Sequence, residues 1–292
     1  MKLFKSNVVF AIMVLTIFTA CNNSSKKTTS YIHNEGMAQG TYYSATYLQP
    51  NGKDLKAQLD SFFVAFDNSL STYNPKSVIS RINSNETDST DLYFREMFEA
   101  SQRISVATEG AFDITVGPLV NAWGFGFKTG NTDSVNVKEL LPFVGYNKVK
   151  IENGKLVKQN KAIVLDASAI AQGYSADLIA DLFEKNGCEN YMIDIGGEIV
   201  CKGKNPKGTN WQIGVDKPID DPANENGELQ VVLNISNKAL TTSGNYRKFY
   251  YKNGKKFAHT IDPVSGYPVQ HDLLSATVVT DNCTDADAYA TA

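Results

Sequence analysis

The chain has 292 residues, of which 42% are hydrophobic and 11% aromatic, a composition that is typical of a globular protein and excludes a disordered one. Its 28 basic and 31 acidic side chains give a net charge of −3, so the charge balance gives no reason to expect a nucleic-acid-binding protein. The length is enough for one large core or for two closely packed subdomains.

The N-terminal residues predict an exported protein. Lys2 and Lys5 precede an apolar run from Val8 to Ala20. This is the pattern of a signal peptide, and the run is shorter than the ~20 apolar residues that a membrane-spanning helix needs. Small residues directly before Cys21 resemble a lipoprotein signal, so we expect cleavage there and acylation of the cysteine. The alternative is an ordinary secretory signal that is cleaved nearby.

A signal peptide over residues 1–20 places the mature protein at the cell envelope. We expect it to be lipid-anchored to a membrane and to face the periplasm or the exterior. Residues 21–34 carry the lipidated cysteine and a polar segment without apolar periodicity, which predicts a flexible tether. Residues 35–292 are then expected to form the folded domain.

The first half of this domain is predicted to contain a strand followed by helices. Residues 40–48 are aromatic and β-branched, which predicts a strand, whereas residues 53–68 place apolar side chains at helical spacing. After a Pro-containing turn, Ser77 is placed to cap a short helix. Residues 92–108 predict another amphipathic helix, which Gly110 ends.

The second half mixes strands with one clear helix. The predicted elements are a pair of short β segments within residues 140–157, a buried strand at 163–165, a helix at 174–186, and strands at 191–195, 211–215 and 229–235. Because these elements lack regular βαβ alternation, the sequence predicts an α+β fold. Cys188, Cys201 and Cys283 form no zinc-binding pattern and are expected to be buried thiols, unless one pair is oxidised outside the cytoplasm.

The segment from Leu240 to Pro268 is dense in polar and aromatic groups. Within it, FYYKNGKKFAHTI predicts a hairpin with an Asn-Gly turn. The hairpin would bring the hydroxyl-rich TTSGNY segment beside His259 and Asp262, and such a glycine turn can receive a phosphate or a sugar edge. A structural histidine is the alternative, and the absence of a neighbouring nucleophile gives no support to a hydrolase triad.

The last residues place Asp287 and Thr291 four positions apart. On a helix this puts two hard oxygen ligands on one face, which suits Mg²⁺ completed by phosphate and water, although a solvated face or cap is the commoner explanation. Thr284 is predicted to cap that helix, with Asp287 in the fourth position of a capping box. Because the chain stops at Ala292 after one or two turns, we expect a C-terminal tail and another strand to be missing.

Three further turns could contact a ligand. Asp166 precedes a small-residue turn that a ligand could approach closely, or else it caps the next helix. Residues 110–113, followed by WGFGF, could form a ligand floor or a glycine-rich packing turn, and Tyr73 could stack on an aromatic ring or pack in the core. Neither G-x-G-x-x-G after a strand nor a P-loop motif is present.

Taken in order, these segments resemble the ApbE family, the FAD:protein FMN transferases. The resemblance runs from Ala38 to the last residue and is carried by AQGTYYSATY, LSTYNPKSVISRIN, GAFDITVGPLVNAWGFG, LDASAIAQGYSADLIADLF, YMIDIGGEI, TSGNYRKFYYKNGKKFAHTIDPVSGYP and DADAYATA. It implies an α+β, T-fold-like architecture around a central FAD cleft, so that residues 35–292 would be an FAD-binding catalytic domain.

The resemblance also implies roles for individual residues. Side chains or backbone that would contact the flavin nucleotide belong to Gln39, Tyr73, Ala111, Phe112, Asp113, Asp166, Gln172, Ser243, Tyr246 and Ile261. Magnesium would be held by Asp287, Thr291 and the backbone carbonyl of Ala169. His259 and Asp262 would position or deprotonate the incoming hydroxyl. The family often has Lys or Glu where this chain has Gln172.

The implied reaction is a Mg²⁺-dependent transfer of FMN from FAD to a serine or threonine hydroxyl of an exported acceptor protein, with release of AMP. Two alternatives use the same pocket. An FAD pyrophosphatase would let water replace the acceptor hydroxyl, and a non-catalytic FAD-binding lipoprotein would store or deliver the flavin.

Overall fold

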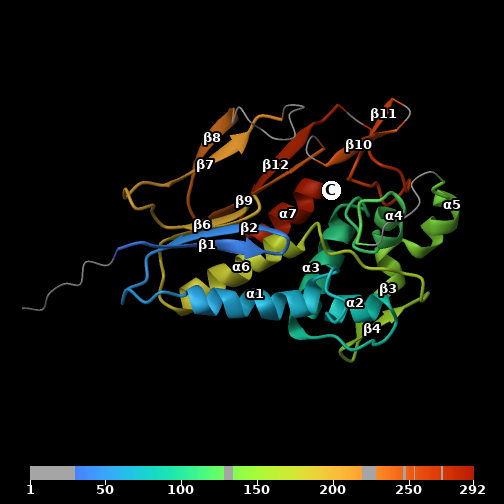
Figure 1. Cartoon of the computed structure of the whole chain (residues 1–292), viewed down its shortest axis with the longest axis horizontal. Helices are drawn as coiled ribbons and strands as arrows, with labels where there is room; N and C mark the ends of the chain where they lie inside the picture. The colour runs from blue at the N-terminus through green and yellow to red at the C-terminus, as the bar shows by residue number, and fades with distance from the viewer. Residues whose placement is uncertain (1–29, 128–133, 219–227, 246–247, 253, 271) are drawn as a thin grey trace, which may run out of the picture.

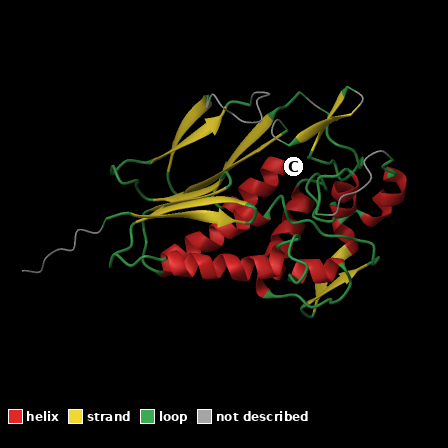
Figure 2. Ribbon diagram, viewed as in Figure 1, coloured by secondary structure: helices red, strands yellow, loops and turns green. Residues whose placement is uncertain are grey.

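The computed structural model describes residues 30–127, 134–218, 228–245, 248–252, 254–270 and 272–292 (Figure 1). Within these residues, the largest sheet is six-stranded in the order β1-β2-β5-β6-β9-β12, and all its neighbouring strands are antiparallel. Its strands are β1 (Ile32–Ala38), β2 (Thr41–Tyr47), β5 (Tyr191–Ile195), β6 (Glu198–Lys202), β9 (Lys238–Gly244) and β12 (Ser275–Thr280). Figure 2 shows the helices gathered beside this sheet, which confirms the predicted α+β class.

Helices cover one face of the sheet, as Figure 1 shows for α1 and α6. They are α1 (Lys56–Leu70), α2 (Val78–Asn83), α3 (Leu92–Ala107), α6 (Ala171–Lys185) and α7 (Cys283–Thr291). The apolar spacing of α1 buries Leu59, Phe62 and Phe66 in the main core, as its periodicity predicts. Ser77 caps α2, because its side chain accepts a hydrogen bond from the Ser80 amide.

The opposite face is covered by a two-stranded sheet, β7 (Trp211–Asp216) and β8 (Leu229–Ile235). Alternation along β6 separates the two layers: Ile199 and Cys201 join the core under β7, whereas Val200 joins the main core under the helices. The sheet is thus buried on both faces at β6. Among the described residues, Cys188, Cys201 and Cys283 are buried free thiols, as predicted.

A smaller lobe flanks this sandwich. It comprises α4 (Gly117–Ala122), α5 (Val137–Leu140), η1 (Leu141–Phe143), η2 (Tyr146–Lys148), β3 (Val149–Glu152) and β4 (Lys155–Lys158), together with the hairpin of β10 (Phe249–Lys252) and β11 (Lys255–Ala258). Both predicted hairpins are present, at β3–β4 and β10–β11. No helix in the described parts of the chain has the length and apolar character needed to cross a membrane.

Three expectations need correction. Residues 163–165 form no strand, because Val164 makes only a single parallel bridge to Val116. The N-cap of α7 is Asn282, whose side chain accepts from the Asp285 amide, and not Thr284. Strand β1 begins at Ile32, inside the segment assigned to the tether, because pairing with β2 continues to that residue. Residues 21–29 of the tether, Cys21 included, lie outside the described residues.

Candidate active site

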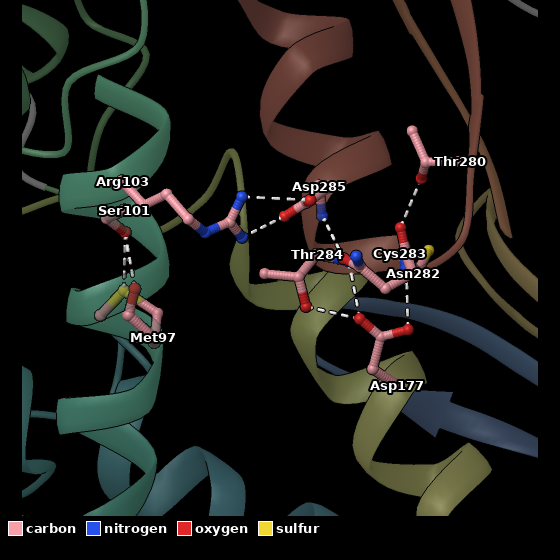
Figure 3. A network of polar contacts seen from close by, with 9 residues as sticks. All are labelled: Met97, Ser101, Arg103, Asp177, Thr280, Asn282, Cys283, Thr284 and Asp285. Carbon is pink, nitrogen blue, oxygen red and sulfur yellow. Dashed lines mark hydrogen bonds and ion pairs between the residues drawn. The ribbon is translucent and has the colours of Figure 1, made fainter. Parts of the chain in front are cut away.

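Helix α7 is fixed at its N-terminus by side chains from two other helices (Figure 3). The Asp177 carboxylate on α6 accepts hydrogen bonds from the backbone amides of Cys283 (2.7 Å) and Thr284 (2.8 Å) and from the Thr284 hydroxyl (2.5 Å). Arg103 on α3 forms a bidentate ion pair with Asp285. A carboxylate at a helix N-terminus satisfies otherwise unpaired amides and favours the helix dipole, so the short helix is held firmly although it has only nine residues.

The close approach of α6 and α7 depends on a glycine. A Cβ atom at Gly173 would lie 2.3 Å from the Cys283 carbonyl oxygen and 2.7 Å from the Asp287 Cβ, so only glycine fits there. The Gly173 amide donates a 3.0 Å hydrogen bond to Asp287 Oδ2. The first turn of α6 thereby orients the Asp287 carboxylate.

Asp287 is only 6% exposed and shares its surroundings with a second acidic residue, Glu198, at the start of β6. Glu198 is 9% exposed, and its Oε2 atom is buried without a hydrogen-bond partner in the described structure. Burial raises the pKa of both carboxyl groups, and the charge of Asp287 raises the pKa of Glu198 further. Sequence reasoning missed Glu198, because an acidic residue at a strand start gives no signal of burial.

These two carboxylates fit a divalent cation. Among the described residues, neither forms an ion pair with Lys or Arg, and the charge of Lys248 only partly offsets the effect of burial on Glu198. Buried charges are normally paired or bound to metal. Mg²⁺ is usually bound by one or two carboxylates, with water and substrate oxygens as its other ligands. In the part of the chain that is described, no group of three or more His, Cys, Asp or Glu could hold a metal ion.

The other two predicted metal ligands lie on the elements that carry this site. Thr291 is the last residue of α7, one turn beyond Asp287 on the same face and partly exposed. Ala169 lies in the turn before α6, partly buried against the main core. The role of its carbonyl stays a prediction.

The structure brings two of the predicted flavin-contacting turns together. The Asp166 amide donates to the Ile114 carbonyl at 2.7 Å. Asp166 Oδ1 accepts from the amide (2.8 Å) and the hydroxyl (2.5 Å) of Ser168, so it closes its own turn and does not cap α6. Asp113 binds the amide and hydroxyl of Thr115 and the Tyr146 amide, which leaves it in a largely structural position.

The remaining predicted flavin contacts differ in exposure. Tyr73 is 74% exposed and offers a free ring, and Ala111 is also exposed, whereas the Phe112 and Ile261 side chains are buried in the cores, so they could contact a ligand mainly through backbone. Gln172 lies in the first turn of α6, and Ser243 pairs with Ala276 near the end of β9. Tyr246 lies outside the described residues.

Gln39 occupies a strained position. It is the first of two residues with positive φ (52° and 76°) in the β1–β2 turn, where Asn or Gly is usual. Its Nε2 atom is buried without a hydrogen-bond partner in the described structure. A strained residue with an unpaired donor is typical of a ligand contact.

The ring of His259 lies with Nδ1 against a backbone carbonyl. Its backbone amide (3.1 Å) and its Nδ1 (3.2 Å) both point to the Lys248 carbonyl, which can only accept, so Nδ1 carries the proton and Nε2 has a free lone pair. Burial lowers the pKa of His259, and the nearby Lys248 charge lowers it further. Thr260 donates to Asn245 at 2.8 Å, so the predicted approach of the TTSGNY segment to this histidine is confirmed at Asn245.

Asp262 has a different setting from the one expected. Its two carboxylate oxygens accept from the amides of Val264 (2.9 Å) and Ser265 (3.2 Å), which closes the turn that follows β11. Within the described structure it makes no hydrogen bond to His259. Its catalytic role stays a prediction, and its visible role is to shape the turn.

Aromatic rings fix the hairpin that carries His259. Trp123 stacks on Phe257 (5.6 Å between centroids), Phe257 on Tyr250 (5.4 Å) and Tyr250 on Phe125 (5.3 Å). Trp123 also donates to the Gly266 carbonyl at 2.9 Å. Trp123 and Phe125 of the WGFGF segment therefore pack on the hairpin, as the packing alternative expects for these two rings, and the ligand floor at residues 110–113 stays a prediction.

Comparisons with known proteins identify similar sequences and folds. The model of the ApbE family matches residues 39–292. A curated relative from Vibrio cholerae, named FAD:protein FMN transferase, is 34% identical over 98% of this chain and 86% of its own. The solved structure of the flavin transferase ApbE from Vibrio cholerae covers 90% of this chain and 86% of its own at 34% identity, with a TM-score of 0.79. The apo flavinyl transferase ApbE from Pseudomonas stutzeri, 28% identical over 90% of this chain and 84% of its own, gives a TM-score of 0.80.

Proposed function

Because the chain belongs to the ApbE family, we propose that it is a Mg²⁺-dependent transferase that moves FMN from FAD to a serine or threonine hydroxyl of an exported acceptor protein and releases AMP. The observation that carries the metal-dependent part is the buried pair of carboxylates on α7 and β6, which no Lys or Arg in the described structure neutralises. Magnesium held by Asp287, Thr291 and the Ala169 carbonyl would neutralise charge on the FAD pyrophosphate.

The residues of the chain divide into binding and proton-transfer groups. Gln39, with its unpaired Nε2, and the exposed ring of Tyr73 are placed to hold the flavin nucleotide. The paired turns at residues 113–115 and 166–168 would give the nucleotide a rigid backbone surface, because each is closed by the aspartate at its start. Rigid positioning supplies much of the catalysis in phosphoryl transfer.

His259 acts as the general base. The acceptor oxygen forms a bond to the FMN phosphorus, the bond from that phosphorus to the AMP oxygen breaks, and the hydroxyl proton passes to His259 Nε2. The lone pair on Nε2 is available because Nδ1 donates to Lys248, and the lowered pKa keeps the ring neutral at pH 7. AMP leaves with the negative charge of its phosphate.

We also propose that Cys21 carries a lipid that holds the enzyme at the envelope, where exported acceptors are found. The support is the signal pattern of residues 1–21. With Cys21→Ser, the protein should leave the membrane fraction. Continued partition of this variant into membranes would refute the lipid anchor.

The test of the metal-dependent reaction is Asp287→Asn. The amide keeps an oxygen for the Gly173 hydrogen bond, so the fold should be retained while the metal charge balance is lost. We expect Mg²⁺-dependent AMP release to fall about 10²-fold or more, since a metal supplies several kcal/mol of charge stabilisation, while FAD binding measured by flavin fluorescence changes little. Full activity of this variant with Mg²⁺ would refute the metal assignment.

A further inference from the structure

Glu198 is the buried ionisable group that the predicted ligand set leaves unexplained. It lies at the start of β6, directly after the Gly196-Gly197 turn, and pairs with Ile195 across the β5–β6 hairpin. A buried carboxylate with an unpartnered oxygen is costly, about 1–3 kcal/mol or more. A buried carboxylate oxygen without a protein partner is therefore expected to interact with a bound ligand or ion.

The position of Glu198 on the sheet directs its side chain to α7. Successive side chains of β6 alternate, and Val200 belongs to the core on the helical face while Ile199 and Cys201 belong to the core under β7. Glu198 shares the face of Val200. Ala286 and Ala288, on either side of Asp287, belong to that same helical core.

The charges around Glu198 are mostly of its own sign. Asp287 and Asp194 are the acidic groups that act on it, and Lys248 is the cationic group that acts on it. Asp194 is already occupied by hydrogen bonds from the Gly197 amide and the Tyr42 hydroxyl. Glu198 is therefore a buried acidic group with acidic neighbours and with an oxygen that has no hydrogen-bond partner in the described structure, which is an environment that a divalent cation can complete.

We propose that Glu198 is a positioning residue of the cation site, supplying a second carboxylate that faces Asp287 across the β6–α7 interface. This inference rests on the proposed function, which places Mg²⁺ at Asp287. It adds Glu198, as a residue beside the bound cation, to the predicted ligands Ala169, Asp287 and Thr291. Outer-shell partners of this kind typically change metal affinity about 10–100-fold.

The experiment is a titration of Mn²⁺ into the FAD-loaded protein, followed by the electron paramagnetic resonance signal of free Mn²⁺. We expect Glu198→Gln to weaken binding about 10–100-fold and Glu198→Asp to restore part of it. Glu189→Gln is the matched control, because Glu189 is exposed and lies nearby in sequence, and it should bind as the wild type does. Equal Mn²⁺ affinity in Glu198→Gln and the wild type would overturn the proposal.

Thermal melting separates a cation-binding role from a merely structural one. Without metal, Glu198→Gln should be at least as stable as the wild type, because it removes an unpaired buried carboxylate, and the stabilisation gained with Mg²⁺ should shrink. A variant that is less stable without metal and keeps the full Mg²⁺ increment would refute the proposal. If the wild type itself takes up no Mn²⁺, the magnesium-dependent function fails as well; if it binds and turns over while Glu198→Gln retains affinity, only the role of Glu198 fails.

Discussion

The protonation of His259 follows from one backbone carbonyl. The Lys248 carbonyl accepts from Nδ1, which leaves Nε2 unprotonated in the neutral ring, and burial lowers the pKa of the side chain. For a histidine, a lowered pKa means that the neutral form persists to a lower pH than the ordinary value of ~6.5. This tautomer and charge are those that a general base needs.

We therefore expect His259→Ala to reduce kcat about 10²–10⁴-fold while FAD binding is retained. Since the neutral ring is active, kcat/KM of the wild type should fall as the pH decreases, with the midpoint of that acidic limb below ~6.5. His33→Ala is the matched control, because His33 is exposed on β1. A wild-type acidic limb above pH 7, or normal turnover in His259→Ala, would show that another group accepts the proton.

The close packing of α6 against α7 at Gly173 positions the Asp287 carboxylate. Replacing glycine by alanine inside a helix normally stabilises a protein by about 0.5–1 kcal/mol. At Gly173 we predict the opposite sign, a loss of about 1–3 kcal/mol, because the added methyl would meet the Cys283 carbonyl and the Asp287 Cβ.

Urea unfolding of Gly173→Ala measures this loss, and Mg²⁺-dependent activity should fall with it because Asp287 moves. A variant as stable as the wild type or more so would contradict the close packing of the two helices. The loss of stability and the loss of activity would both come from Gly173. The sequence around this glycine gives no sign that it affects the site.

Most elements were predictable where a local rule is strong. The Asn-Gly turns gave the β3–β4 and β10–β11 hairpins, and helical spacing gave α1 and α3. The strand predicted at 163–165 failed because an apolar run acquires strand structure only from a long partner, and Val116 supplies a single bridge. Asn282 rather than Thr284 caps α7, and both residues have suitable side chains, so composition alone could not decide.

The whole molecule explains why the last residues matter. Helix α7 packs among α6, α3 and the central sheet (Figure 1), and most of its residues, Asp287 included, are buried there. The resemblance to family motifs predicted that Asp287 and Thr291 on this helix are magnesium ligands. The resemblance did not predict Glu198, because its burial follows from a sheet covered on both faces by β7 and α7, elements distant from it in sequence.

The central claim is that FMN is transferred and not merely released. The most direct measurement is to incubate the protein with FAD, Mg²⁺ and exported candidate acceptors while following AMP release and acceptor mass together. The account predicts that an acceptor gains the mass of one FMN per AMP released and that EDTA abolishes both changes. AMP with free FMN and unmodified acceptors would make the protein a pyrophosphatase, and tight FAD binding without AMP would make it a carrier; either result would contradict the transferase.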